Sequence, residues 1–216
     1  MHTSRALITA VTVRPLVTRA YMMQSSAITI HQHVQSLLSE YQCPYQFHEV
    51  RAAFMGAIAS PYVVDPLFEL NALWDGEFPE LASQEKLDEV TKVFLEDFWS
   101  LLAQHVSEDA VLPFMLTPLE KATSLGELKA HAQLRGEELD SFLTGFFQDQ
   151  ESLELDEEVG ESLDILEELV QLLTDMVNME ETTALGAAEL SDLADNLLKM
   201  TEMAELEMNN LIVSCG

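Results

Sequence analysis

The side chains best suited to chemistry in this chain are its 38 acidic residues and 6 histidines, which could together hold a divalent metal. Metal sites in helical bundles use Glu-x-x-His pairs, because residues three apart project from one face of a helix. No histidine of this sequence has a glutamate three positions before it. Glu127 and His131 lie four positions apart, but no second pair of this kind accompanies them. We therefore expect no metal site.

Other catalytic patterns are missing as well. The sequence has no glycine-rich phosphate loop, no Gly-x-Ser-x-Gly turn and no calcium-loop spacing among its acids. We therefore expect no catalytic residue, no bound cofactor and no enzyme activity. A carboxylate-based, metal-dependent helical enzyme is the alternative, because a linear sequence does not reveal which acids cluster in space.

The charge of the chain points to a class of partner. Ten basic residues against 38 acidic ones give a net charge of −28, and the segment between Arg135 and Lys199 contains no base. Such a surface repels nucleic acid and anionic membranes, so neither is an expected partner. It favours a basic protein partner. The candidate contact face consists of Asp156, Glu157, Glu158, Glu161 and Asp164.

One short pattern occurs twice and places a glycine inside an apolar helical run both times. Residues 49–58 read EVRAAFMGAI, and residues 138–147 read ELDSFLTGFF. A glycine inside a helix costs about 1 kcal/mol against alanine, so its recurrence indicates close backbone packing. Two unrelated helices with one glycine each are the alternative. The expected packing residues are Phe54, Gly56, Trp74, Phe142 and Gly145.

Helical periodicity dominates the chain from residue 29 onward, and no stretch has a convincing strand pattern. We predict an all-α protein, with a multi-helix, bundle-like domain and an additional C-terminal helix. Proline, glycine and capping residues bound most of the predicted helices. These helices span residues 29–41, 47–60, 66–74, 84–106, 127–148, 151–173 and 187–212.

The chain divides into three predicted parts. Residues 1–24 form an N-terminal tail, residues 25–177 an acidic all-helical domain, and residues 178–216 the C-terminal helix with a short tail. The first part carries arginines and no acids. We expect it to be disordered or to precede a natural start at Met22 or Met23, and a targeting presequence is the alternative.

The C-terminal helix carries an apolar seam close to heptad spacing. An isolated helix of this length is marginal in water, so the seam must be buried against something. We predict that it mediates a homodimer, and folding back on its own domain is the alternative. The seam residues are Leu190, Leu193, Leu197, Met200 and Met208.

Cysteine usage and hydropathy indicate a cytoplasmic protein. Cys43 and Cys215 are the only cysteines and have no regular spacing, which is typical of reduced thiols. No stretch approaches the roughly 18 consecutive apolar residues that a membrane span needs.

Four segments carry a family resemblance: Glu49 to Gly56, Pro61, Leu73-Trp74-Asp75-Gly76, and Phe142 to Phe146. In their order and spacing they resemble the YgfB/YecA-like family of bacterial helical proteins. Some members carry a cysteine-rich, zinc-binding tail, but this chain lacks it, so no metal function is implied. The resemblance implies an all-helical cytosolic protein with no established catalytic residues.

These observations favour a non-catalytic accessory or regulatory protein that acts through contact with another protein. A chaperone for apolar segments of a client protein is a further alternative, and it would require an exposed apolar groove.

Overall fold

The computed structural model describes residues 28–74, 76, 78–104, 116–148, 155–180 and 186–215. Every regular element in these ranges is a helix, which confirms the predicted all-α fold. None of the helices described combines the length and the apolar character needed to cross a bilayer. The expected N-terminal tail, residues 1–24, lies outside the described residues.

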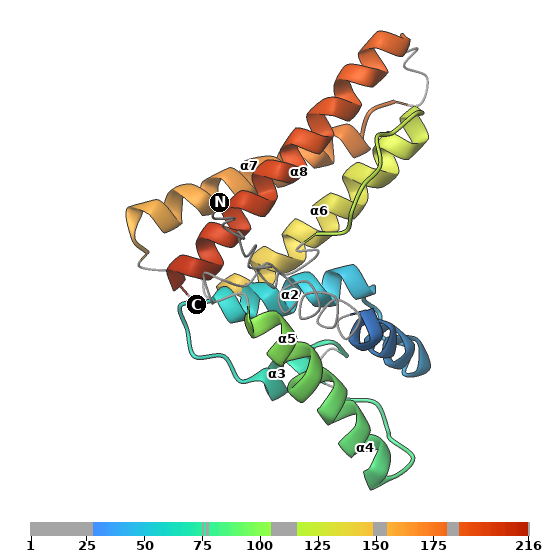
Figure 1. The fold of residues 1–216 in the computed structure, drawn as a ribbon, viewed down its shortest axis with the longest axis vertical. Helices are drawn as coiled ribbons and strands as arrows, with labels where there is room; N and C mark the ends of the chain where they lie inside the picture. The colour runs from blue at the N-terminus through green and yellow to red at the C-terminus, as the bar shows by residue number, and fades with distance from the viewer. Residues whose placement is uncertain are drawn as a thin grey trace, which may run out of the picture.

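Short helices come first along the chain and long helices follow. The short ones are residues 28–40, α2 (Phe47–Ala59), α3 (Pro66–Ala72), α4 (Gln84–Thr91), the π-helix η1 (Lys92–Trp99) and α5 (Ser100–Ala103). The long ones are α6 (Leu125–Phe147), α7 (Glu157–Val177) and α8 (Ala187–Cys215). In Figure 1, α6, α7 and α8 occupy one half of the molecule and α3, α4 and α5 the other, with α2 at the junction.

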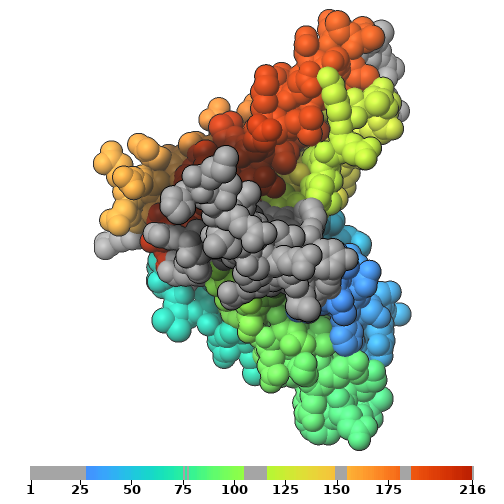
Figure 2. Space-filling model, in the orientation of Figure 1, coloured from blue at the N-terminus to red at the C-terminus, as the bar shows by residue number. Residues whose placement is uncertain are grey.

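The two halves give the molecule two projecting ends. Figure 2 shows that α8 and the start of α6 form one end, and that α4 forms the other. A single core nevertheless joins them, because α2 packs against α5, α6 and α8. The predicted C-terminal helix therefore shares its core with the rest of the chain.

Side-chain caps fix several helix starts. The Ser83 hydroxyl accepts a hydrogen bond from the Lys86 nitrogen at 3.4 Å, and the Ser124 hydroxyl accepts one from the Glu127 nitrogen at 3.2 Å. At the start of α2, a Glu49 carboxylate oxygen accepts from the Gln46 nitrogen at 2.6 Å. Each bond satisfies a backbone donor that the helix itself leaves unpaired.

The helix predicted over residues 84–106 is divided in the structure. Its first two turns are α-helical, η1 is π-helical, and α5 resumes the α-helix. Within η1, Lys92 and Asp97 lie five residues apart and form an ion pair at 2.9 Å, a spacing that matches the wider π turn. Phe94 and Phe98, both within η1, are fully buried in the core.

Aromatic residues fill the core between α2 and the π-helix. The Phe54 ring lies 5.8 Å from Phe98 and 5.3 Å from Trp99. Trp74 is buried beside them, with its ring 6.4 Å from Phe94 and its indole nitrogen donating to the Tyr41 carbonyl at 3.0 Å. The indole is thus buried with its one donor satisfied.

The two pattern glycines lie at one crossing, where α2 and α6 face each other. A Cβ atom added to Gly56 would lie 2.9 Å from the Phe146 nitrogen and closer still to the Phe142 carbonyl oxygen. Backbones this close leave no room for a side chain, so the position requires glycine.

The second glycine makes the reciprocal contact. A Cβ atom on Gly145 would lie 3.0 Å from the Ala57 nitrogen and closer still to the Ala53 carbonyl oxygen. Each glycine therefore contacts two residues of the opposite helix: the one three positions before that helix's glycine and the one directly after it. This reciprocity relates the two copies of the pattern by an approximate two-fold axis.

The predicted dimer seam lies against the chain's own helices. Leu197 and Met208 are buried in the shared core, and Leu190, Leu193 and Met200 are half-buried against it. This burial corresponds to the alternative of folding back. A homodimer through the seam remains a prediction, and it would have to use the half-buried residues or displace α8 from its core.

Replacing Gly56 with alanine tests the crossing. The new methyl group must displace the α6 backbone, so we expect the free energy of unfolding to fall by about 1–3 kcal/mol, despite the better helix propensity of alanine. Urea unfolding followed by circular dichroism measures the change.

Gly160→Ala is the matched control. No atom lies within 4 Å of a Cβ added at this position in α7, so the variant should keep or gain up to about 1 kcal/mol. Equal effects of the two substitutions would contradict the close approach of α2 and α6.

Candidate functional site

The two-fold relation gives the α2–α6 crossing two edges built from equivalent pattern positions. Positions are counted from the first residue of each copy, so Glu49 and Glu138 are at position 1 and Arg51 and Asp140 at position 3. On one edge, Arg51 of the first copy forms an ion pair with Glu138 of the second. The equivalent positions on the other edge are Asp140 and Glu49, and both line one cleft. The two edges are formed by equivalent backbone positions, but one carries an arginine and a glutamate and the other carries two acids.

The first edge is closed by a buried ion pair. Arg51 Nη2 donates a hydrogen bond to Glu138 Oε1 at 2.6 Å, and the same nitrogen contacts the Thr117 hydroxyl at 3.1 Å. The guanidinium lies over the Phe47 ring, 5.8 Å from its centroid. Arg51 is 4% exposed and Glu138 is 0% exposed, so water does not screen the pair.

Arg135 completes this cluster. It donates to the Glu138 carboxylate through Nη1, to the Thr117 carbonyl through Nη2 at 2.8 Å, and to the Thr201 hydroxyl through Nε at 3.2 Å. The Thr117 nitrogen and hydroxyl also donate to Glu138 Oε1, at 2.8 and 2.6 Å. Burial lowers the pKa of both arginines, and the charges of Glu138 and Glu205 oppose that shift.

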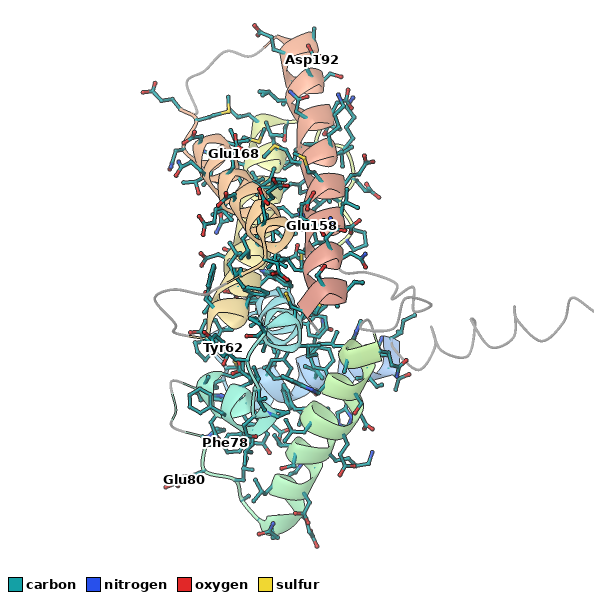
Figure 3. All side chains as sticks on the ribbon, turned by 90° about the vertical axis from the view of Figure 1, so that its left-hand side faces the viewer. Tyr62, Phe78, Glu80, Glu158, Glu168 and Asp192 are labelled. Carbon is teal, nitrogen blue, oxygen red and sulfur yellow. The ribbon has the colours of Figure 1, made fainter. Side chains whose placement is uncertain are left out.

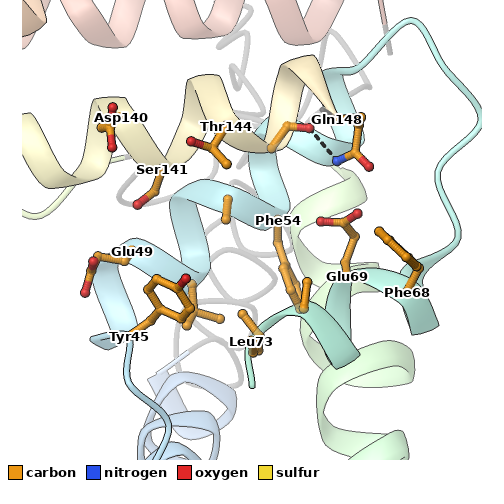
Figure 4. Close-up of a pocket in the computed structure, with 14 residues that line it drawn as sticks. Tyr45, Glu49, Phe54, Phe68, Glu69, Leu73, Asp140, Ser141, Thr144 and Gln148 are labelled. Carbon is orange, nitrogen blue, oxygen red and sulfur yellow. Dashed lines mark hydrogen bonds between the residues drawn. The ribbon is translucent and has the colours of Figure 1, made fainter. Parts of the chain in front are cut away.

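The second edge is an open cleft of about 310 Å³. Residues of both pattern copies line it, and α3 closes its far side (Figure 4). The lining residues are Tyr45, Glu49, Val50, Ala53, Phe54, Phe68, Glu69, Ala72, Leu73, Asp140, Ser141, Thr144, Gly145 and Gln148.

The charge of the cleft is entirely acidic. Glu49, Glu69 and Asp140 contribute carboxylates, and no described lining residue is lysine, arginine or histidine. On the buried edge a base stands at pattern position 3, whereas on this edge Asp140 stands there. The cleft therefore has two acids where the equivalent edge has an ion pair.

Apolar and hydroxyl groups form the walls of the cleft. Phe54 and Leu73 are buried behind it, while the rings of Tyr45 and Phe68 are 40% and 63% exposed. The Thr144 side chain comes from α6 (Figure 4). A concave apolar site with a few convergent polar groups is the usual form of a ligand-binding site.

The acidic face predicted from the sequence lies at the start of α7. Two of its members, Glu158 and Glu161, line a second cleft of about 470 Å³ together with Glu207 of α8. Glu158 and Glu168 mark this helix in Figure 3. Asp156, Glu157 and Asp164 do not belong to the lining, and the acids of the first cleft were absent from the predicted face.

Neither metal-binding nor nucleophilic groups converge in the described part of the chain. No three histidine, cysteine or acidic residues there are placed to hold a metal ion. Burial raises the pKa of the Cys43 and Cys215 thiols, which keeps them protonated and poorly nucleophilic. Burial and the nearby Arg51 charge lower the pKa of His31.

Sequence reasoning missed the buried cluster and the cleft. Arg51 and Arg135 are two of only ten bases, and each has apolar residues three or four positions away on both sides, which is a usable signal that it lies on the apolar face of its helix. No comparable signal marks Tyr45 or Phe68, because helix packing alone brings them to the cleft.

Comparison of the chain with protein-family models, with curated proteins and with solved structures found no match. The site is therefore interpreted from its own geometry.

Replacing Glu138 with glutamine tests the buried cluster. Two buried arginines would lose their carboxylate, so we expect the free energy of unfolding to fall by about 3–5 kcal/mol. The adjacent Glu137→Gln is the control, because Glu137 is partly exposed and its contact with His48 can persist as a neutral hydrogen bond. Similar urea midpoints for the two variants would contradict a structural role of the cluster.

Proposed function

We propose that this chain is a non-catalytic accessory or regulatory protein whose acidic cleft binds a cationic side chain of a protein partner. One observation carries the proposal. Glu49 and Asp140 occupy the positions at which the equivalent edge of the crossing holds the Arg51–Glu138 ion pair. The cleft thus has the acids of an ion-pair site without a base among the described residues.

Electrostatics favours a cation at this place. Glu49 and Asp140 both line the cleft, so a positive group bound there would be attracted by each carboxylate. The apolar walls formed by Phe54 and Leu73 exclude part of the water that would otherwise screen the interaction. The net charge of −28 would also speed the approach of a basic partner.

A chemical-shift titration tests the cleft directly. The probes are N-acetyl-lysine amide and N-acetyl-arginine amide, with neutral N-acetyl-glutamine amide as the reference. We expect the cationic probes to shift the amide signals of Glu49, Thr144 and Gly145 in ¹⁵N-labelled protein. Raising the salt concentration should weaken the effect, because exposed charges are screened over about 8 Å at physiological ionic strength.

Two matched double variants separate the cleft from the general acidity of the chain. Glu49→Gln with Asp140→Asn should weaken binding by about tenfold. Glutamine at residue 49 keeps a capping acceptor for α2. Glu85→Gln with Asp192→Asn removes the same charge from exposed positions elsewhere and should leave binding unchanged. Equal losses in the two double variants would refute a specific cleft.

The second acidic cleft, at the start of α7, is the other candidate contact surface. It is favoured by the convergence of Glu158 and Glu161 with Glu207, although its walls are less apolar. Charge reversal at Asp156, Glu157, Glu158, Glu161 and Asp164 tests it in the same titration. If these changes leave binding intact, this face is not the contact surface.

Several broader expectations remain proposals. They are the YgfB/YecA-like assignment, the cytoplasmic location, and the absence of nucleic-acid and membrane partners. The alternatives of a metal-dependent helical enzyme and of a chaperone for apolar client segments also remain open to test. Metal analysis of protein purified without chelator addresses the first alternative, and binding of an apolar dye to the native protein addresses the second.

Self-association through α8 is a separate prediction. If the half-buried seam residues mediate a homodimer, light scattering at tens of micromolar should give twice the chain mass of 24.2 kDa. Leu190→Ser with Leu193→Ser should then restore the monomer. A full-length chain that runs as a monomer would rule out this dimer.

A further inference from the structure

Four methionines line one cleft between α7 and α8, which pack against each other (Figure 1). The cleft has a volume of about 500 Å³, and Met176, Met179, Met200 and Met203 are half of its eight lining residues. The structure describes six methionines in all, so most of its thioethers are gathered at this one place. The cleft shares no residue with either acidic cleft.

The methionines come as two pairs with the same spacing. Met200 and Met203 lie three residues apart on α8, so their side chains project from one face of that helix. Met176 lies in the last turn of α7, and Met179 follows in the turn after it. The Met179 nitrogen donates to the Met176 carbonyl at 3.3 Å, and the Met179 carbonyl accepts from Lys129 Nζ at 2.9 Å. These two bonds hold the backbone of the one member that lies outside a helix.

Core packing does not account for the cluster. The other two described methionines, Met55 and Met208, are 2% and 0% exposed, whereas Met203 is 43% exposed and the remaining three are half-buried. Protein interfaces usually depend on tryptophan, tyrosine or arginine anchors, and the described lining contains none of them. Its only apolar member besides the methionines is Leu172. The distinctive property of the cleft is therefore its thioethers.

Thioethers select soft metal ions. A methionine sulfur is neutral and polarizable, which suits Cu(I), whereas Mg²⁺ and Ca²⁺ take oxygen ligands and Zn²⁺ takes thiolate, imidazole or carboxylate. It has no proton to lose, so metal binding to it does not compete with protonation. Methionine stands outside the ligand classes of histidine, cysteine and acidic residues, which form no metal cluster in the described part of the chain.

The charged groups of the cleft fit an ion of low charge. Asp175 and Lys199 both line it, so one negative and one positive group offset each other. The Gln171 side chain donates to Asp175 at 3.1 Å. A divalent ion would find one carboxylate here and a lysine that repels it, whereas a monovalent ion held by neutral sulfurs needs no carboxylate.

We propose that the α7–α8 cleft is a Cu(I) site whose ligands are the thioethers of Met176, Met179, Met200 and Met203. Helical bundles hold metals in this way, with paired side chains from facing helices. The proposal is independent of the proposed function, because the methionine cleft and the acidic cleft have no residue in common.

NMR of full-length protein with ¹³C-labelled methionine methyl groups reads the site directly. The protein carries Cys43→Ser and Cys215→Ser, so that no thiolate competes for copper. One equivalent of Cu(I), kept reduced with ascorbate under nitrogen, should shift the methyl signals of the four cleft methionines and leave those of Met55 and Met208 in place. Zn²⁺ should shift none of them.

Matched double variants assign the ligands. Met176→Leu with Met200→Leu removes one thioether from each helix at similar volume, and should weaken Cu(I) binding by about tenfold or more in competition with a chromophoric Cu(I) chelator. Met55→Leu with Met208→Leu removes two thioethers from the core and should leave the affinity unchanged. Lys199→Gln should strengthen binding by about two- to threefold, because it removes a nearby positive charge.

The pH dependence gives a further check. The affinity should stay constant between about pH 6 and 8, because none of the proposed ligands titrates there. A loss of affinity toward the acidic end would indicate histidine ligands and would overturn the assignment.

Three other results would also overturn it. Cu(I) that shifts no cleft methyl signal would leave the cleft an adaptable apolar surface. Equal losses in the two methionine double variants would show that copper binds elsewhere. Equal shifts with Zn²⁺ would contradict a site selective for soft ions.

Discussion

The close approach of α2 and α6 is the constraint on which the rest of the structure depends. Gly56 and Gly145 let each backbone lie against the other, so no side chain separates the two helices at their crossing. This contact fixes the angle between the half that contains α6, α7 and α8 and the half that contains α3, α4 and α5. It also gives the crossing two equivalent edges, since the two glycine patterns contact each other reciprocally.

The edges show how similar backbone surroundings take different roles through charge. On one edge, Arg51 and Arg135 both donate to the Glu138 carboxylate, and the Thr117 nitrogen and hydroxyl donate to it as well, so this carboxylate is buried with its charge paired. On the other, Glu49 and Asp140 face a cleft without a base among the described residues. A buried carboxylate needs a permanent partner, because water cannot solvate it. A carboxylate in an open cleft is solvated by water and can bind a partner reversibly.

Much of this fold could be predicted from the sequence, because amphipathic periodicity and proline or glycine boundaries are local signals. The extents of α2, α6 and α8 follow from them to within a few residues. The π-helical turn over Lys92–Trp99 could not be predicted, because its apolar residues recur at the three- and four-residue steps of an ordinary α-helix. The repeated glycine pattern indicated close packing, but nothing in one dimension showed that the two glycines pack against each other. The cleft depends on that pairing, and so its residues were not foreseen.

The central claim is that the cleft lacks the cation that the opposite edge contains. Its most direct test is the stability and binding of Asp140→Arg, which would place a base at the pattern position equivalent to Arg51. The account predicts that this variant unfolds at higher urea than Asp192→Arg, a control with the same charge change at an exposed site, by about 0.5–1 kcal/mol, and that it no longer binds cationic probes. If the two variants were equally stable and Asp140→Arg still bound the probes, the equivalence of the two edges and the function built on it would be contradicted.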